Sequence, residues 1–422
     1  MMWRLNEWLE QLSDADAAVR ARAVRRIARL GRRGLSPEDG LLVLKASSLP
    51  LAPSGDATDD PSAALLRAVL QVPYPEYLPA IVARFPHWNR RARHEALRGL
   101  MSIDDARAAE AVMTILRRHA RDSVMPALPL GQHARHPDHA EVFFPELLSY
   151  LSVPRLAFSI AALTLSFAAT CQFDPELLLP HAGRFLAMFR RRREWLGPRQ
   201  RTEGIGWMWE QAYHSRRWQA GVLLDLLGHV PTADVEAELR RALIEFTDPR
   251  LRMGAALSLL RHEKAVDPET ITEIAASPEC RKWLFDGLHR LERAAFFPEC
   301  YRQQASLAES DLVNWLAYPS ELGRPPDEIE LVQAVPFHTE TDAGWADYFL
   351  FRFRTLPPHW SAREGWMAGV SGPFLRHEQP TIQALGDTFS AFTPWDRKSV
   401  SEHIDDVREL IRTWRDRHVS AE

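Results

Sequence analysis

The residues best suited to binding chemistry lie in one stretch, residues 184–218. Nine arginines and three glutamates give this stretch a net charge of +6, and four tryptophans lie among those charges. Arginine and tryptophan dominate the binding energy of protein interfaces, and both also stack on nucleobases. We therefore predict a partner-binding surface that consists of Arg190, Arg191, Arg192, Arg193, Trp195, Arg199, Arg201, Trp207, Trp209, Arg216, Arg217 and Trp218.

Glycines within this stretch predict a long loop between two helices, because Gly197-Pro198 and Gly204-Ile205-Gly206 break a helical pattern. Trp207 and Trp209 are two positions apart, which on a helix would direct their side chains about 200° apart. We expect at least one of the two to be partly exposed and to anchor a partner. The alternative is a solvated helix end whose tryptophans are buried.

The partner that we predict for this surface is a protein with an acidic surface, and nucleic acid is the alternative. The whole chain has a net charge of −4 at neutral pH. Overall acidity disfavours contacts with phosphates that depend on charge alone. Residues 325–422 are also acidic, with ten basic and sixteen acidic side chains.

Other groups of residues point less clearly to chemistry. His133, His136 and His139 have a spacing that suits metal ligands on a helix, but Pro137 lies among them and no second ligand group follows at a diagnostic distance. We predict a polar loop there, without a metal or other cofactor. Gly365, Gly369 and Gly372 lack the lysine and the helix start of a phosphate-binding loop, which favours tight strand turns.

No catalytic motif of diagnostic spacing occurs, so we predict a protein that is not an enzyme. A small enzyme domain at 327–422, targeted by the rest of the chain, is an alternative. Three separated cysteines, Cys171, Cys280 and Cys300, offer no disulfide framework, and the first residues lack the pattern of a signal peptide. Both features predict a cytoplasmic protein.

Residues 156–173 have no charged side chain over 18 positions, close to the length of a membrane span. Five polar residues interrupt this stretch, and Pro154 and Pro175 bracket it. A helix buried inside a larger protein has the same composition. We therefore predict a buried helix and no membrane association.

A recurring pattern at helical spacing predicts the elements that position the binding stretch. In this frame an apolar residue, usually followed by arginine, precedes small or apolar residues four and eight positions later. It begins at Val19, Ala92, Leu156, Trp218 and Leu251. The gaps correspond to one or two units of roughly 31 to 37 residues, the length of a helical hairpin repeat.

Each hairpin needs a second helix, which we place at 61–72, 104–118 and 234–246. Alanine at the middle of the frame lets a neighbouring helix approach closely. We therefore expect Ala23, Ala96 and Ala255 to be buried between helices.

Residues 14–23 (DADAAVRARA) and 248–257 (DPRLRMGAAL) resemble the second helix of a HEAT-type repeat, in which Asp or Pro opens the helix and a Val-Arg pair precedes alanine. The resemblance implies a HEAT-like α-solenoid over residues 1–318, whose concave face usually binds a protein or nucleic acid. By analogy we expect a bacterial immunity or antitoxin-type protein that captures an effector. The alternative is a nucleic-acid-binding solenoid similar to the HEAT-like DNA glycosylases, which spread basic residues over several repeats.

The composition changes after Tyr318. Residues 319–326 (PSELGRPP) cannot continue a helix and predict a linker. Alternating side chains then predict strands around residues 329–333 and 349–354, with weaker candidates at 366–374 and 388–392. The spacing of Ser399 and Glu402 predicts the start of a terminal helix over 399–418. The predicted fold is therefore mainly α: a HEAT-like α-solenoid at 1–318, followed by a small α+β domain at 327–422 whose antiparallel sheet is covered by that helix.

Overall fold

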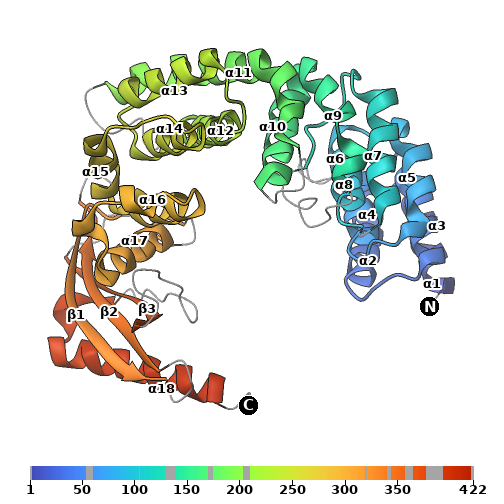
Figure 1. Cartoon of the computed structure of the whole chain (residues 1–422). Coiled ribbons are helices and arrows are strands. Elements are labelled where there is room, and N and C mark those ends of the chain that lie inside the picture. The colour runs from blue at the N-terminus through green and yellow to red at the C-terminus, as the bar shows by residue number, and fades with distance from the viewer. Residues whose placement is uncertain are drawn as a thin grey trace. The chain divides into compact units, whose positions relative to one another are not determined.

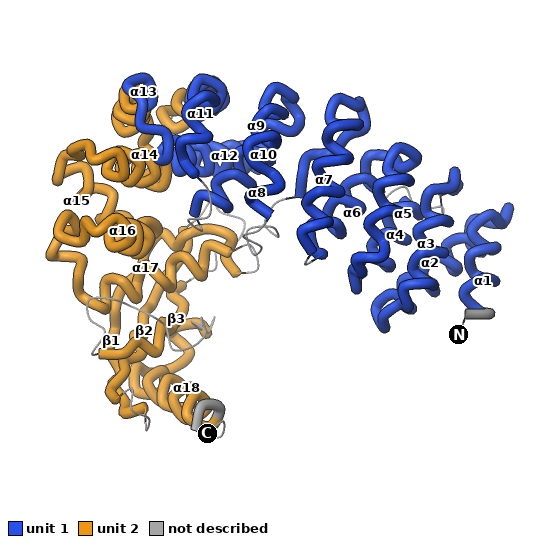
Figure 2. Tube along the Cα trace, turned by 45° about the vertical axis from the view of Figure 1, so that its right-hand side comes forward, with its two compact units in different colours: residues 1–196, 205–235 blue, residues 197–204, 236–422 orange. Residues whose placement is uncertain are grey.

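The computed structural model of the 422-residue chain describes residues 2–53, 60–103, 105–129, 139–169, 174–202, 210–318, 321–339, 344–356, 365–376 and 393–419. The chain forms two compact units, of which the first contains residues 1–196 and 205–235 and the second contains residues 197–204 and 236–422 (Figure 2). Helices hold 67% of the residues, which makes the fold mainly α as predicted.

The first unit contains helices α1 Met2–Gln11, α2 Ala17–Gly31, α3 Pro37–Ser47, α4 Pro61–Val69, α5 Leu78–Arg84, α6 Arg90–Leu100, α7 Ala106–His119, α8 His139–Phe143, α9 Glu146–Ser149, α10 Pro154–Ala169 and α12 Gln211–Leu227. Two helices cross the division between the units: α11 Ala182–Gln200 and α13 Ala233–Glu245. Short 3-10 helices lie at Pro75–Tyr77, Phe85–His87, Tyr150–Ser152 and Pro175–His181.

Within the first unit, several helices pack on the helix two places later in the chain. Helix α2 contacts α4 and α4 contacts α6, while α3 contacts α5 and α5 contacts α7. Neighbouring helices such as α3 and α4, or α6 and α7, join these two rows (Figure 1). Two rows of helices that follow the chain and share one core are the arrangement of an α-solenoid.

The recurring frame marks the helices of one row. Ala23, Ala96 and Ala255 are completely buried, which confirms the expectation for all three. The prediction that residues 61–72 form the second helix of a hairpin is wrong. Helix α4 packs between α2 and α6 and so belongs to the same row as the frame helices. Its Leu65 and Val69 keep the apolar spacing of four, but Leu66 stands where α2, α6 and α14 have the arginine of the frame.

The arginine of the frame links successive repeats. Arg20 donates hydrogen bonds to the backbone carbonyl oxygens of Asp14 and Ala15, just before its own helix, and to that of Pro53, well beyond it. Arg93 in α6 makes the same kind of contacts: two with carbonyl groups before the helix and one with a carboxylate 29 positions later. In α2 and α6 the frame therefore provides a hydrogen-bonded clamp as well as an apolar face, whereas Arg252 of α14 pairs with Glu273.

The second unit contains helices α14 Pro249–Arg261, α15 Pro268–Ala276, α16 Pro278–Arg290, α17 Gln304–Leu316 and α18 Val400–Val419, with strands β1 Glu328–His338, β2 Trp345–Arg354, β3 Met367–Leu375 and β4 Thr393–Pro394. Short 3-10 helices lie at Ala294–Phe296, Glu299–Tyr301 and Trp395–Arg397. Helix α14 packs on α15 and α16, and α16 packs on α17.

The four strands form an antiparallel sheet in the order β1-β2-β3-β4. On one face, Tyr348 and Leu350 share a core with Val407, Ile411 and Trp414 of α18, which lies across the strands (Figure 1). The other face packs on α17, the last helix before the sheet. The predicted C-terminal α+β fold, an antiparallel sheet covered by a terminal helix, is therefore confirmed.

Two details of this region refine the prediction. Gly369 lies inside β3, where a Cβ atom would come within 3.0 Å of Leu312 in α17, so the close helix explains this glycine better than the predicted turn. The predicted capping box is present, because the Ser399 backbone N–H donates to Glu402 at 2.7 Å. The candidate strand at 388–392 lies outside the described residues.

The predicted domains, 1–318 and 327–422 with a linker at 319–326, stay a prediction. The compact units divide the chain elsewhere, and within 319–326 the side chains of Leu322 and Arg324 are buried. Helix α10 is extensively buried, and in the described part of the chain no helix has the length and apolar character that crossing a membrane requires. Cys280 and Cys300 are free thiols, while Cys171 lies outside the described residues.

Candidate functional site

Helices α11 and α12 carry most of the predicted surface. Arg190 to Arg193 and Trp195 lie in α11, and Arg216 to Trp218 lie in α12. The helix break predicted at Gly197-Pro198 is wrong, because α11 continues through Pro198 to Gln200, and α12 begins at Gln211. Only the last turn of the helix follows the proline, so little of the hydrogen-bond ladder is lost.

The end of α11 is also held in place. The Gln200 side-chain carbonyl accepts hydrogen bonds from the backbone N–H groups of Thr247, at 2.9 Å, and Asp248, at 3.2 Å. Arg199 and Arg201 belong to the second unit with Gln200. We therefore confine the candidate site to residues of the first unit.

Trp207 and Trp209 lie outside the described residues, so their expected exposure stays a prediction.

The side chains of the four consecutive arginines, Arg190 to Arg193, point in different directions because neighbouring residues on a helix are about 100° apart. Arg190 and Arg191 are exposed, Arg192 is half-buried and Arg193 is buried. Arg217 is half-buried in α12. Helix periodicity thus divides the run between the surface and the interior.

Two contacts join α11 to α12. The Arg192 Nε donates a hydrogen bond to the Gln219 side-chain oxygen at 3.1 Å. The Arg216 guanidinium lies over the Trp195 ring, 3.9 Å from its centroid. Cation–π contacts of this kind fix a guanidinium in place without using its hydrogen-bond donors.

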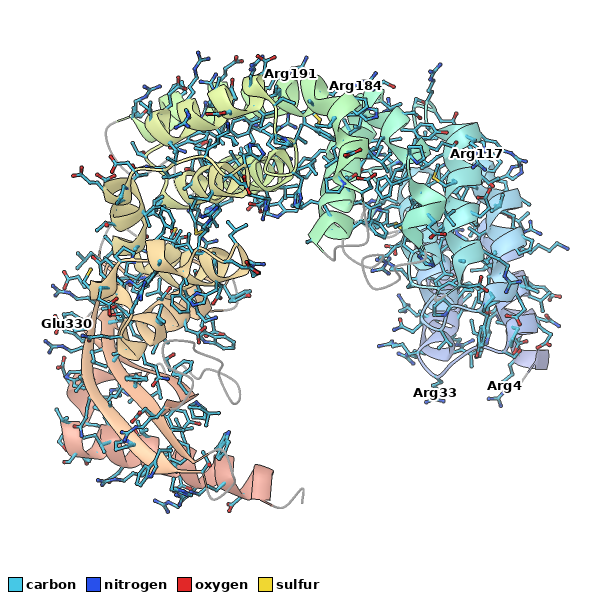
Figure 3. The ribbon with its side chains drawn as sticks, viewed as in Figure 1. Arg4, Arg33, Arg117, Arg184, Arg191 and Glu330 are labelled. Atoms are coloured by element: carbon cyan, nitrogen blue, oxygen red, sulfur yellow. The ribbon has the colours of Figure 1, made fainter. Side chains whose placement is uncertain are left out.

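A hollow of about 540 Å³ opens between these two helices; we call it the α11–α12 hollow. Its lining residues are Arg191, Arg192, Trp195, Ala212, Ser215, Arg216 and Gln219. Figure 3 labels Arg191 in α11, together with Arg184 seven positions earlier in the same helix. Three of these residues were not predicted from the sequence, although their spacing along α12 places them on the helix face that carries Arg216: Ala212, Ser215 and Gln219.

All the charged side chains that line the hollow are positive. Burial lowers the pKa of Arg192, and the neighbouring charges of Arg191 and Arg216 lower it further. Among the residues that the structure describes, no carboxylate forms an ion pair with any of these three guanidinium groups. The positive charge of the hollow is therefore not balanced by its described surroundings.

Trp218 extends the surface beyond the hollow. Its side chain is 51% exposed, and its ring packs edge-on against Phe158 of α10, with 5.1 Å between the ring centroids. A tryptophan held on one side and open on the other is suited to insertion into a pocket of a partner.

Of the three histidines with the spacing of metal ligands, only His139 lies among the described residues. His139 is buried at the start of α8 and packs against Phe143, whereas His133 and His136 lie outside the described residues. Within the described ranges, no group of side chains is arranged as a metal site.

Comparison with known proteins adds no assignment. No protein-family model matches the chain, and no curated protein sequence matches it.

Proposed function

We propose that this protein is a non-enzymatic scaffold that binds another protein with an acidic surface. The binding site in this proposal is the α11–α12 surface, defined as Arg191, Arg192, Trp195, Arg216 and Trp218. The observation that carries the proposal is the half-exposed Trp218 on the same helix as Arg216, whose charge has no acidic partner among the described residues.

The tryptophan and the arginines of this surface are expected to contribute to binding in different ways. Burying the exposed part of Trp218 supplies apolar contact area, and tryptophan is among the residues that most often dominate interface energy. The arginines attract an acidic surface from a distance and orient it. Arg192 and Arg216 are already held by Gln219 and Trp195, so little side-chain entropy is lost when they bind.

The test compares two tryptophans with the same exposure. Trp218→Ala is expected to weaken binding to an identified, purified partner by about thirtyfold, the effect of losing a typical hot spot. Trp345→Ala is the matched control, because Trp345 is also 51% exposed but lies in β2. If both variants bind the partner as tightly as the unmodified protein, the proposal is wrong.

Salt dependence tests the electrostatic part of the proposal. Affinity is expected to fall between low and physiological ionic strength, because exposed charges are screened over about 8 Å at 0.15 M salt. Binding that is insensitive to salt contradicts capture by charge. A single-stranded oligonucleotide that binds more tightly than any protein partner, and that loses affinity in Trp218→Ala, would instead favour the nucleic-acid alternative.

The finer parts of this proposal concern its biological setting. We propose a HEAT-like repeat protein of the bacterial cytoplasm whose partner is an effector or toxin that binding neutralises. The repeat pattern supports the first part, and the immunity role depends on analogy. Co-expression tests it: the protein is expected to protect cells from the partner's toxicity, and Trp218→Ala is expected to abolish that protection. A partner without toxicity contradicts the immunity role and leaves the binding function intact.

A further inference from the structure

The α11–α12 hollow has the properties of an anion-binding pocket. Arg191, Arg192 and Arg216 all line it, and its other lining side chains are uncharged. A guanidinium keeps its charge at all physiological pH values, so the three groups repel one another permanently. A bound anion would offset that repulsion.

The donors are positioned before any ligand binds. Arg192 is fixed from two sides, since its Nε donates to Gln219 at 3.1 Å and its side chain also donates to the Met188 carbonyl oxygen at 3.4 Å. Stacking on Trp195 occupies the flat face of the Arg216 guanidinium and leaves its in-plane N–H groups without a partner in the described structure. Fixed donors of this kind bind an oxyanion with little loss of entropy.

The number of charges selects the class of anion. A single carboxylate carries one negative charge, whereas a phosphate monoester carries about −1.5 to −2 at neutral pH and presents three acceptor oxygens. Three guanidinium groups provide one donor group for each acceptor oxygen of a phosphate monoester, whose charge also offsets more of theirs than a carboxylate would. A volume of about 540 Å³ also leaves room for the chemical group that bears the phosphate.

We infer that the α11–α12 hollow binds a phosphoryl group. This inference rests on the proposed function, because it names the acidic group that the partner, or a small phosphorylated molecule bound with it, presents to this surface.

Isothermal titration of the full-length protein with inorganic pyrophosphate, phosphate and acetate tests the inference. Pyrophosphate is expected to bind most tightly and acetate not measurably. Arg192→Gln and Arg216→Gln are each expected to weaken pyrophosphate binding by about tenfold or more, because each removes one charged hydrogen-bond donor. Arg184→Gln makes the same charge change in α11 at an exposed residue outside the hollow, and it is expected to alter affinity by less than about twofold.

Phosphatase treatment of the purified partner distinguishes the two sources of the phosphoryl group. Loss of partner binding after treatment assigns the group to the partner, and unchanged binding together with pyrophosphate affinity assigns it to a small molecule. The inference is overturned if the unmodified protein binds neither phosphate nor pyrophosphate, or if Arg184→Gln weakens binding as much as Arg216→Gln. In that case a partner that still depends on Trp218 leaves the proposed function standing. Conversely, pyrophosphate binding without any effect of Trp218→Ala on the partner refutes the proposed function alone.

Discussion

Arginine has opposite surroundings in two regions of the molecule. In α16, Arg281 is buried and donates to the backbone carbonyl oxygens of Ala275, Ala276 and Ser306, and it pairs with Glu309 at 2.9 Å. In the α11–α12 hollow, three arginines lie together without a carboxylate partner in the described structure.

The difference between these regions separates structural arginine from binding arginine. Arg281 replaces the water that its charge has lost with four protein acceptors, so its positive charge stabilises the fold. Arg192 is half-buried beside two like charges and has acceptors for only part of its guanidinium. An arginine that does not stabilise the fold at its position is therefore expected to contribute to binding instead.

Replacing Arg281 is expected to have the largest effect on stability. Arg281→Met keeps much of the side-chain volume but leaves Glu309 and three carbonyl groups without their donor, so the free energy of unfolding should fall by about 3 kcal/mol. Urea unfolding followed by circular dichroism measures this change. Arg290→Met, at an exposed position of the same helix, is the control and should change stability by less than about 0.5 kcal/mol. Equal losses in both variants would remove the distinction between the two kinds of arginine.

The partner of Arg281 should matter less than Arg281 itself. Glu309→Gln removes the charge but keeps an acceptor of the same size, and Arg281 retains its carbonyl acceptors. We expect a loss of about 1 kcal/mol in the free energy of unfolding, the difference between a charged and a neutral hydrogen bond. A loss as large as that of Arg281→Met would mean that the ion pair with Glu309, and not the hydrogen bonds to carbonyl groups, provides most of the stabilisation.

Arg192 provides the contrasting case. Arg192→Met loses the hydrogen bonds to Gln219 and to the Met188 carbonyl oxygen but relieves repulsion with Arg191 and Arg216. These effects oppose one another, so stability should change by less than about 0.5 kcal/mol. Unfolding curves collected beside those of Arg281→Met give the comparison directly. If Arg192→Met destabilises the protein by several kcal/mol, the hollow is a structural feature and the comparison fails.

The sequence predicted the fold better than it predicted the site. Residues such as Ala23 and Ala255 occupy one helix face at a fixed spacing, and a local pattern of this kind is visible in any single sequence. The hydrogen-bonded clamp of Arg281 was not predicted from the sequence, although Cys280, Leu284 and Leu288 repeat the spacing of the frame. Leu284 stands at the middle position, where the frames that begin at Leu156 and Trp218 also have larger apolar residues, so this repeat was visible in the sequence.

The predicted binding stretch falls on α11 and α12, but the arrangement of its side chains was not predictable. Which of four consecutive arginines faces solvent depends on how α11 is rotated against its neighbours, and Arg193 is the one that is buried. The pairing of Arg192 with Gln219 joins residues 27 positions apart. Nothing in the local sequence specifies such a contact, because it arises only when two helices pack.

The smallest expected effect concerns Asp122, the carboxylate that completes the clamp of Arg93 in α6. The hydrogen bond from Arg93 holds the pKa of Asp122 below its ordinary value, and a contact with His119 at 3.0 Å lowers it further. A carboxyl group whose pKa is lower in the folded state stabilises the protein when it is ionised, and this stabilisation is lost as the pH falls through the folded-state pKa.

We therefore expect Asp122→Asn to reduce stability by a constant amount above about pH 5, where an aspartate is ionised in the folded and the unfolded chain. Below about pH 4 the difference from the unmodified protein should shrink, because protonation removes from the unmodified protein the interaction that the variant already lacks. Urea unfolding of both proteins at several pH values between 3 and 7 measures this difference. The side chain of Asp122 is 37% exposed, so water screens the pair and the effect should be smaller than that of Arg281→Met. A difference that does not vary with pH would mean that the Arg93 clamp acts through its backbone contacts, as Arg20 does with three carbonyl groups and no carboxylate.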